Sequence, residues 1–130
     1  MKKALLTAAS LVLFATHALA DPIYGIWQTP TDDNGNSGYV EVDACGDLIC
    51  GTLIKSFDAN GNPMESANIG RHIVWDMQAK GNGKYAGGKI WSPDRDKTYK
   101  SKLALDGDTL KVSGCVLVVC RDGGTWTRVQ

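Results

Sequence analysis

Cysteine and histidine are the residues of this chain that could bind a metal ion or take part in redox chemistry. Two cysteine pairs share one spacing, Cys45/Cys50 and Cys115/Cys120, with four residues between the partners. Thiolates can exchange disulfides or bind metals, but this spacing is not Cys-x-x-Cys and no thioredoxin-like βαβ pattern surrounds it. An even cysteine count in a short chain therefore favours two structural disulfides over a redox-active pair.

A metal site or a catalytic triad would have to be built around His72. Metal sites usually need several His, Cys or carboxylate ligands in register, so we predict no metal, no cofactor and no catalytic residue. A hydrolase that combines His72 with a serine and an aspartate is an alternative, although the sequence has no Gly-x-Ser-x-Gly motif. The segment from Asp32 to Asn36 resembles a calcium loop, but Ser37 replaces the sharp-turn glycine, which favours an ordinary turn.

Large apolar side chains are the third group that could form a site. Four aromatic residues fall near the same end of the predicted strands, where they would line a pocket for a flat or aliphatic molecule if they point inward. Core filling is the alternative for each of them. The run Val116–Val119 places four consecutive apolar residues at a hairpin end, and we expect it to close the mouth of a pocket or to dock another protein. The predicted ligand-binding residues are Phe57, Trp75, Trp91, Tyr99, Leu117 and Val118.

Short β-type runs separated by Gly/Asn/Asp turns must position these residues, because no segment has a clear helical period. The clearest run alternates Tyr99, Ser101 and Leu103 with Lys100 and Lys102, as an antiparallel sheet with one buried face requires. The eight predicted strands are Tyr24–Thr29, Gly38–Ala44, Gly51–Phe57, His72–Met77, Lys84–Trp91, Lys97–Leu105, Thr109–Cys115 and Thr125–Val129.

The turns indicate how these strands connect. Asn82-Gly83 and Asp106-Gly107 are strong hairpin signals because these residue types tolerate positive φ. We therefore predict an all-β fold, a small antiparallel up-and-down barrel of about eight strands, with a β-sandwich as the alternative. The longer connections, including 58–71 with a short helical turn and 116–124, share one end of this barrel, which would be its mouth.

The positions of the predicted strands also distinguish between the three possible disulfide pairings. It places the early and the late cysteine pair at opposite ends of the barrel, whereas a disulfide needs Cα atoms within roughly 7 Å. We therefore predict two local disulfides, Cys45–Cys50 and Cys115–Cys120.

The start of the chain has the three-part pattern of a secretory signal peptide. Lys2 and Lys3 precede an apolar run that is too short to span a bilayer, and Ala18-Leu19-Ala20 forms a small-x-small cleavage site. We predict a signal peptide at 1–20, a single domain at 21–130, and a secreted or periplasmic protein without a membrane span. Acidic and basic residues are equal in number, at 14 each, and without its first two lysines the mature chain carries a net charge of about −2, which argues against nucleic-acid binding.

Several segments occur in an order that resembles a known bacterial exported family, number 2147 among the domains of unknown function. They are Gly25-Ile26-Trp27, the CGDLICG stretch, Gly87–Tyr99 and Thr125–Arg128. The resemblance implies a lipocalin-like barrel and no established activity. In lipocalins the Trp of Gly-x-Trp packs beside a late Arg at the closed end, so the resemblance implies structural roles for Trp27 and Arg128, in which the guanidinium covers the indole.

The leading functional hypothesis is a non-enzymatic, secreted or periplasmic carrier or sensor of a small hydrophobic ligand. A protein-binding module of the envelope, or an inhibitor, with a side-chain-filled barrel is the second hypothesis. A monomer or weak dimer is expected in either case.

Overall fold

The computed structural model describes residues 20–130. The predicted signal peptide at 1–20 therefore lies outside the described residues except for Ala20. Within the described part of the chain, no helix is long and apolar enough to span a membrane.

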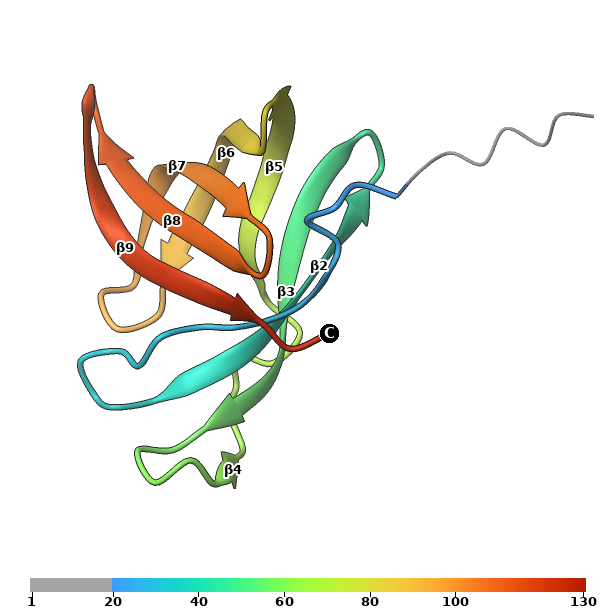
Figure 1. The fold of residues 1–130 in the computed structure, drawn as a ribbon. Coiled ribbons are helices and arrows are strands. Elements are labelled where there is room, and N and C mark those ends of the chain that lie inside the picture. The colour runs from blue at the N-terminus through green and yellow to red at the C-terminus, as the bar shows by residue number, and fades with distance from the viewer. Residues whose placement is uncertain (1–19) are drawn as a thin grey trace, which may run out of the picture.

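One antiparallel sheet closes on itself to form the molecule (Figure 1). Each long strand pairs with the long strands before and after it in sequence, including β2 with β3. The pairing of β1 with β9 closes the sheet, so that eight strands form a barrel. The remaining strand, β4, has two residues and pairs with the end of β3. The strands are β1 Gly25–Gln28, β2 Ser37–Cys45, β3 Leu48–Phe57, β4 Pro63–Met64, β5 His72–Gly81, β6 Lys84–Ser92, β7 Lys97–Asp106, β8 Thr109–Val116 and β9 Val119–Arg128. The predicted up-and-down barrel is confirmed and the alternative sandwich is wrong.

Tight turns set the register where the sequence predicted them. Asn82 and Gly83 join β5 to β6 with φ values of 56° and 74°, the left-handed conformation that a two-residue hairpin turn requires. Gly107, with φ of 56°, opens the turn between β7 and β8. Local turn chemistry therefore specifies where these two hairpins turn.

Two predictions about the connections are wrong. Residues 116–124 do not form a long loop, because β8 continues to Val116 and β9 begins at Val119. The 58–71 connection contains β4 and a turn at 67–70 instead of a helical turn. The sequence lacks a glycine or asparagine between Cys115 and Cys120, so the tight turn and the full length of the two strands were missed. The ladder from β8 to β9 includes the direct pair Cys115 and Cys120.

Two loops at one end of the barrel have the same Asp-x-Asn-Gly-Asn sequence, beginning at Asp32 and at Asp58. In each loop the aspartate Oδ1 accepts hydrogen bonds from the backbone N–H groups two and four residues later, at 2.8–3.0 Å. The loops touch, since a Cβ on Gly35 would lie 3.0 Å from the Ala59 Cβ. These bonds are those of Asx turns, which close each loop through its own backbone.

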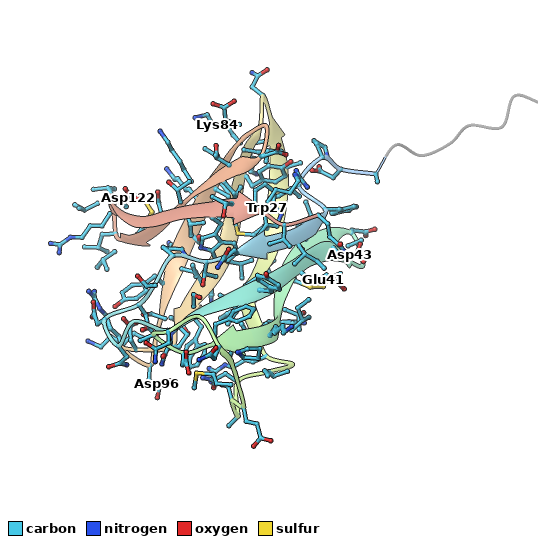
Figure 2. All side chains as sticks on the ribbon, turned by 60° about the horizontal axis from the view of Figure 1, so that its bottom comes forward. Trp27, Glu41, Asp43, Lys84, Asp96 and Asp122 are labelled. Carbon is cyan, nitrogen blue, oxygen red and sulfur yellow. A yellow bond between two sulfur atoms is a disulfide. The ribbon has the colours of Figure 1, made fainter. Side chains whose placement is uncertain are left out.

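Fifteen buried apolar side chains fill the barrel. They come from every long strand and include three tryptophans and Tyr85, and Figure 2 shows the side chains packed between the strands. The core residues are Ile23, Trp27, Val40, Val42, Ile49, Leu53, Ile73, Val74, Met77, Tyr85, Trp91, Leu103, Leu110, Val112 and Trp126. An eight-stranded barrel is just wide enough for such filling, so its size and its core agree.

Trp27 and Arg128 meet at the end of the barrel where the described chain begins and ends. Trp27 is fully buried, its indole N–H donates to the Ile23 carbonyl at 2.9 Å, and the Arg128 guanidinium carbon lies 4.3 Å from the ring centroid. Arg128 also donates to the carbonyls of Tyr24 and Pro22, at 3.1 and 2.8 Å. One side chain thus attaches the N-terminal segment to the last strand.

The two predicted disulfides are present. Cys45–Cys50 joins β2 to β3 and Cys115–Cys120 joins β8 to β9, with Cα separations of 5.8 and 4.0 Å. Each bond therefore links the two strands of one hairpin.

Candidate functional site

Trp91 lies in the packed interior and has no free face for a ligand. Its side chain is 4% exposed, and the Arg71 guanidinium carbon lies 3.4 Å from the ring centroid. The indole N–H donates to Asp96 Oδ1 at 2.9 Å. Arg71 covers the ring in a cation–π contact and Asp96 binds the indole N–H, so residues of this chain already satisfy the side chain. Sequence reasoning missed Arg71 and Asp96, since the only available signal was an aspartate five residues after a tryptophan.

Phe57 and Trp75 are half-buried and lie apart from each other. Phe57 packs edge-on against Tyr39, with ring centroids 4.8 Å apart, and the Lys55 ammonium lies 5.6 Å from its centroid. Trp75 packs on the core from β5. The four predicted aromatic residues therefore do not line one common pocket.

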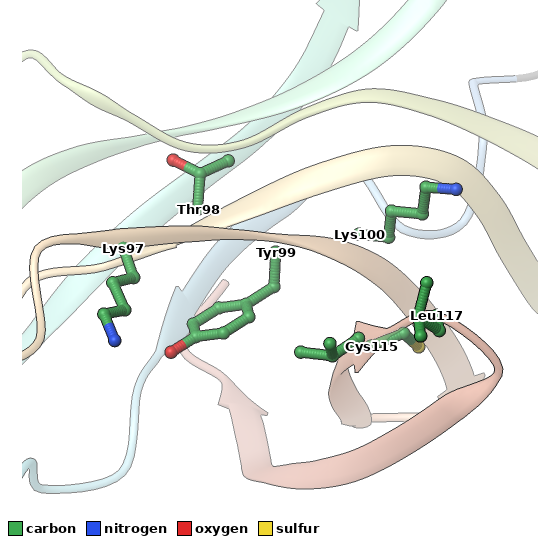
Figure 3. Close-up of a pocket in the computed structure, with 7 residues that line it drawn as sticks. Lys97, Thr98, Tyr99, Lys100, Cys115 and Leu117 are labelled. Atoms are coloured by element: carbon green, nitrogen blue, oxygen red, sulfur yellow. The ribbon is translucent and has the colours of Figure 1, made fainter.

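Tyr99 does come together with the end of the β8–β9 hairpin. An open depression of about 410 Å³ lies between the start of β7 and this hairpin, and we refer to it as the tip depression (Figure 3). Figure 3 shows Lys97 and Tyr99 on one side of β7 and Thr98 on the other. The depression combines an aromatic ring and aliphatic groups with two lysines among its lining residues, which suits a molecule with an apolar part and a negative charge; Lys100 rises on the same side of β7 as Thr98. Its lining residues are Lys97, Thr98, Tyr99, Lys100, Cys115, Val116 and Leu117.

The hairpin end itself is the most exposed apolar feature of the described chain. Val116, Leu117, Val118 and Val119, which we call the apolar tip, are 62%, 87%, 96% and 59% exposed. In Figure 1 this hairpin runs out from the barrel at the upper left. Scattered exposed aliphatic residues are normal, but four adjacent ones at a protruding end indicate an interaction surface.

The backbone of the apolar tip is also strained. Leu117 has φ of 55°, a left-handed conformation that costs a non-glycine residue about 1–2 kcal/mol. The Cys115–Cys120 disulfide closes the hairpin directly behind it, at paired positions of the ladder. A glycine here would relieve the strain, so the sequence keeps a large apolar side chain at a conformational cost.

A second surface hollow lies on the connection between β4 and β5. It measures about 560 Å³, is wide open, and is lined by Glu65, Ser66, Ala67 and Ile69. Its lining residues include no oppositely charged pair and no aromatic ring, so we assign it no role.

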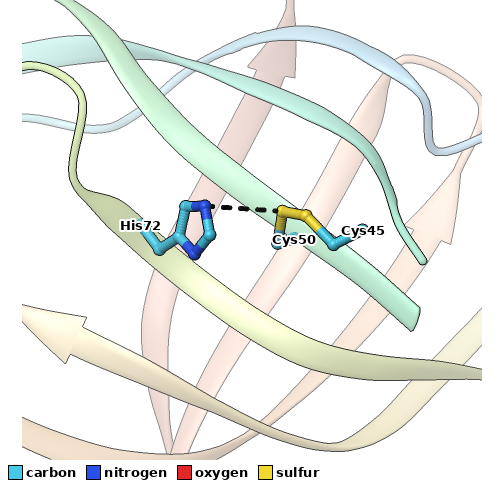
Figure 4. A group of neighbouring side chains, drawn as sticks. All are labelled: Cys45, Cys50 and His72. Carbon is cyan, nitrogen blue, oxygen red and sulfur yellow. Dashed lines mark hydrogen bonds between the residues drawn. A yellow bond between two sulfur atoms is a disulfide. The ribbon is translucent and has the colours of Figure 1, made fainter. Parts of the chain in front are cut away.

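The third feature is the group formed by His72 and the first disulfide (Figure 4). His72 Nε2 lies 3.8 Å from Cys50 Sγ, and the side-chain nitrogen and sulfur atoms of His72, Cys45 and Cys50 lie within 4.8 Å of one another. These residue types could bind zinc as free thiols. In the disulfide the two sulfur atoms are bonded to each other, which leaves the imidazole as the one ordinary ligand of the group.

Comparison with known proteins first gives the class, which is that of the lipocalin-like barrels. The chain is similar to a solved Helicobacter pylori structure described as "Protein HP1028 from the human pathogen Helicobacter pylori belongs to the lipocalin family". The two are 20% identical with a TM-score of 0.66 over 86% of this chain and 85% of that one, which shows the fold alone.

The family follows from the sequence model "Uncharacterized protein conserved in bacteria (DUF2147)", which matches residues 25–128. The chain belongs to this family, as its motifs indicated. No curated protein sequence matches the chain. The disulfides and the bacterial family are compatible with an exported protein.

Proposed function

We propose that this protein is a non-enzymatic, exported binding protein that docks on anionic lipid surfaces through its apolar tip and the lysines beside it. The observation that carries the proposal is the exposure of four adjacent aliphatic side chains on a strained, disulfide-closed hairpin. Its fold is that of lipocalins, many of which bind apolar molecules, but the apolar surface on offer lies outside the barrel. The exported location rests on the signal-like sequence at 1–20 and on the two disulfides.

The shape and chemistry of the tip favour a lipid surface over a single ligand molecule. A ligand held in the tip depression would contact Val116 and Leu117, which line it, but would leave Val118 and Val119 in water. The apolar zone of a bilayer could cover all four side chains at once. Lys97 and Lys100, which line the depression, would then lie at the level of the head groups, where long basic side chains keep their charge in water.

Estimates of the binding free energy show that both the apolar tip and the lysines are needed. Burying a whole aliphatic side chain contributes roughly 1.5–3 kcal/mol, so the exposed fractions of the four tip residues contribute about 5 kcal/mol together. That alone corresponds to a dissociation constant of about 0.2 mM. A lysine near an anionic surface adds about 1 kcal/mol, so Lys97 and Lys100 bring the constant to about 10 μM. Weak, reversible docking that depends on negative lipid is therefore the expected behaviour.

Vesicle binding tests the proposal. Purified mature protein is mixed with vesicles of phosphatidylethanolamine containing or lacking phosphatidylglycerol, and the bound fraction is measured by flotation. We expect binding that is about 30-fold tighter to the anionic vesicles, and that weakens as salt rises because charges at a surface are screened. Leu117→Asp and Val118→Asp should each weaken it at least tenfold, since each removes about 1.5 kcal/mol of apolar contact.

The matched control is Val129→Asp, which also places a charge at an exposed valine, 42% exposed, beyond the other end of β9. It should bind vesicles like the wild type. Unchanged circular dichroism and unfolding midpoints establish that the tip variants are folded.

Three results would overturn the proposal. The wild type could fail to bind anionic vesicles, or Leu117→Asp could bind as well as Val129→Asp. A monomeric fatty acid could also bind with micromolar affinity whether or not Val118 is changed to Asp, which would identify a small-ligand carrier that uses the tip depression instead.

A further inference from the structure

The pairing of β3 with β5 brings His72 beside the first disulfide. The two strands are in register at Thr52 and His72, two residues from Cys50, and the imidazole Nε2 comes to 3.8 Å from Cys50 Sγ (Figure 4). A structural disulfide has no need of an imidazole in contact with one of its sulfur atoms. This contact is independent of the apolar tip, which lies on another hairpin.

The two sulfur atoms of this disulfide differ in access. Cys45 is exposed and Cys50 is 4% exposed. An incoming thiolate therefore meets Cys45 first, and the sulfur that must leave is the one beside His72. Thiol–disulfide exchange is faster when the leaving thiolate is stabilised.

We propose that the Cys45–Cys50 disulfide is a thiol-exchange site in which His72 stabilises the departing Cys50 thiolate. The thiolate of a dithiol attacks Cys45 Sγ, forms a mixed disulfide with it, and breaks the Cys45–Cys50 bond. The electron pair of that bond stays on Cys50 Sγ, which takes a proton from the His72 imidazolium or from water. The second thiolate of the dithiol then attacks the mixed disulfide and releases Cys45. The dithiol is oxidised to its disulfide by two electrons, and the protein disulfide is reduced to two thiols.

Charged side chains of both signs lie on the elements next to this site. Asp43 and Glu41 of β2 are in register with Cys50 and Thr52, and Figure 2 shows them next to each other. Carboxylates close to a cysteine disfavour its thiolate. Asp47 is a further carboxylate, in the β2–β3 turn. Lys89 of β6 lies in register with Trp75 of β5, and the guanidinium of Arg71, the residue before His72, is stacked on Trp91. Of these groups, His72 is the one whose side chain contacts the Cys50 sulfur and can carry a positive charge.

The second disulfide provides an internal reference with the same spacing and the same access. Cys120 is exposed and Cys115 is 6% exposed, so this pair also has one accessible and one buried sulfur. Cys115 is in register with Lys100 of β7, so a cation is close to this bond as well. The ratio of the two reduction rates, and its change when His72 is replaced, is therefore the informative quantity.

The experiment follows reduction of the folded mature protein by dithiothreitol. Samples are quenched with an alkylating reagent, and the extent of reduction at each disulfide is read by peptide mass spectrometry. At pH 6, His72→Asn should slow cleavage of Cys45–Cys50 by about threefold to tenfold relative to Cys115–Cys120, the effect of raising the leaving-thiol pKa by one to two units at a sensitivity of about 0.5. His72→Lys keeps a positive charge and should retain most of the wild-type ratio.

The pH dependence of the ratio gives a second measurement that needs no variant. An imidazole stabilises a thiolate as a cation only while it carries its second proton, so the wild-type rate at Cys45–Cys50 relative to that at Cys115–Cys120 should fall as the pH of the assay is raised from 5 to 8. The common effect of the attacking thiolate cancels in the ratio. In the His72→Asn variant the ratio should be flat.

The proposal is overturned if the ratio is the same in the wild type and in His72→Asn, or if the wild-type ratio does not change between pH 5 and 8. If His72→Asn loses its fold, both disulfides become labile together, and the wild-type pH profile alone then decides. Because vesicle binding is measured on the oxidised protein, failure of either proposal leaves the other in place.

Discussion

The closed end of the barrel permits a quantitative prediction about Arg128. Its guanidinium makes two charged hydrogen bonds to backbone carbonyls of the N-terminal segment and lies 4.3 Å from the centroid of the buried Trp27 ring. It also forms an ion pair of 3.0 Å with Asp108, whose side chain is 85% exposed. The hydrogen bonds contribute about 1.5 kcal/mol each at the low end of their range and the cation–π contact about 1–2 kcal/mol, whereas an exposed ion pair contributes about 0–1 kcal/mol.

Arg128→Met removes the charge and the donors but keeps an unbranched side chain over the indole. We expect it to lower the free energy of unfolding by about 3 kcal/mol, because some contact with Trp27 remains. That corresponds to a fall in Tm of about 12 °C for a domain of this size. Arg128→Lys keeps the charge but loses the planar fork, so its effect should be intermediate.

The assay is equilibrium unfolding in urea, followed by circular dichroism with both disulfides intact. The matched control is Asp108→Asn, which breaks the ion pair alone and should cost less than about 1 kcal/mol. An unchanged denaturant slope would show that stability, and not the unfolded state, has changed. If Asp108→Asn destabilises the protein as much as Arg128→Met, the ion pair holds this end and our assignment is wrong.

Two further predictions concern the interior. Burial, followed by a hydrogen bond to Asp21 and the negative charge of Asp21, raises the pKa of the Tyr85 phenol above its usual value of about 10. The protonated phenol therefore stabilises the fold fully below pH 10, and this stabilisation is lost as pH rises further. In urea unfolding between pH 9 and 11, the wild type should lose about 1.4 kcal/mol more stability than Tyr85→Phe, and equal losses would contradict this. A Cβ on Gly88 would overlap the Trp75 carbonyl oxygen, so Gly88→Ala should lower the free energy of unfolding by about 3 kcal/mol. A Cβ on Gly46 has open space around it, so Gly46→Ala should lower that free energy by only about 1 kcal/mol, because of its positive φ. Thermal unfolding compares the two variants, and equal Tm values would refute the clash at Gly88.

Local chemistry explains why most of the barrel was predictable. Asn82-Gly83 requires no tertiary partner to form its turn, and the alternation of Ser101 and Leu103 with two lysines marks the buried face of β7 directly. Once the strand order was known, the separation of the hairpin ends decided the disulfide pairing.

The candidate sites depend on contacts between residues that are distant in sequence, which no local pattern reports. His72 lies 22 residues from Cys50, and their contact exists only because the 58–71 connection returns the chain to β3. Arg71 reaches Trp91 across a similar separation. The tip residues were identifiable as an apolar run, but their exposure depends on how far β8 and β9 extend, and the missing turn signal concealed that extension.

The distribution of apolar surface favours a partner outside the barrel over a ligand inside it. An internal ligand would have to displace large side chains such as Trp91 or Tyr85, which are 4% and 3% exposed, and removal of a packed aromatic group from a core costs about 3–5 kcal/mol. The Arg71 and Asp96 contacts to Trp91 would be lost as well. The apolar tip already exposes its aliphatic groups to water, so docking there gains free energy without disturbing any packed residue. Binding through the outer hairpin is therefore the route that leaves the core of this small barrel intact.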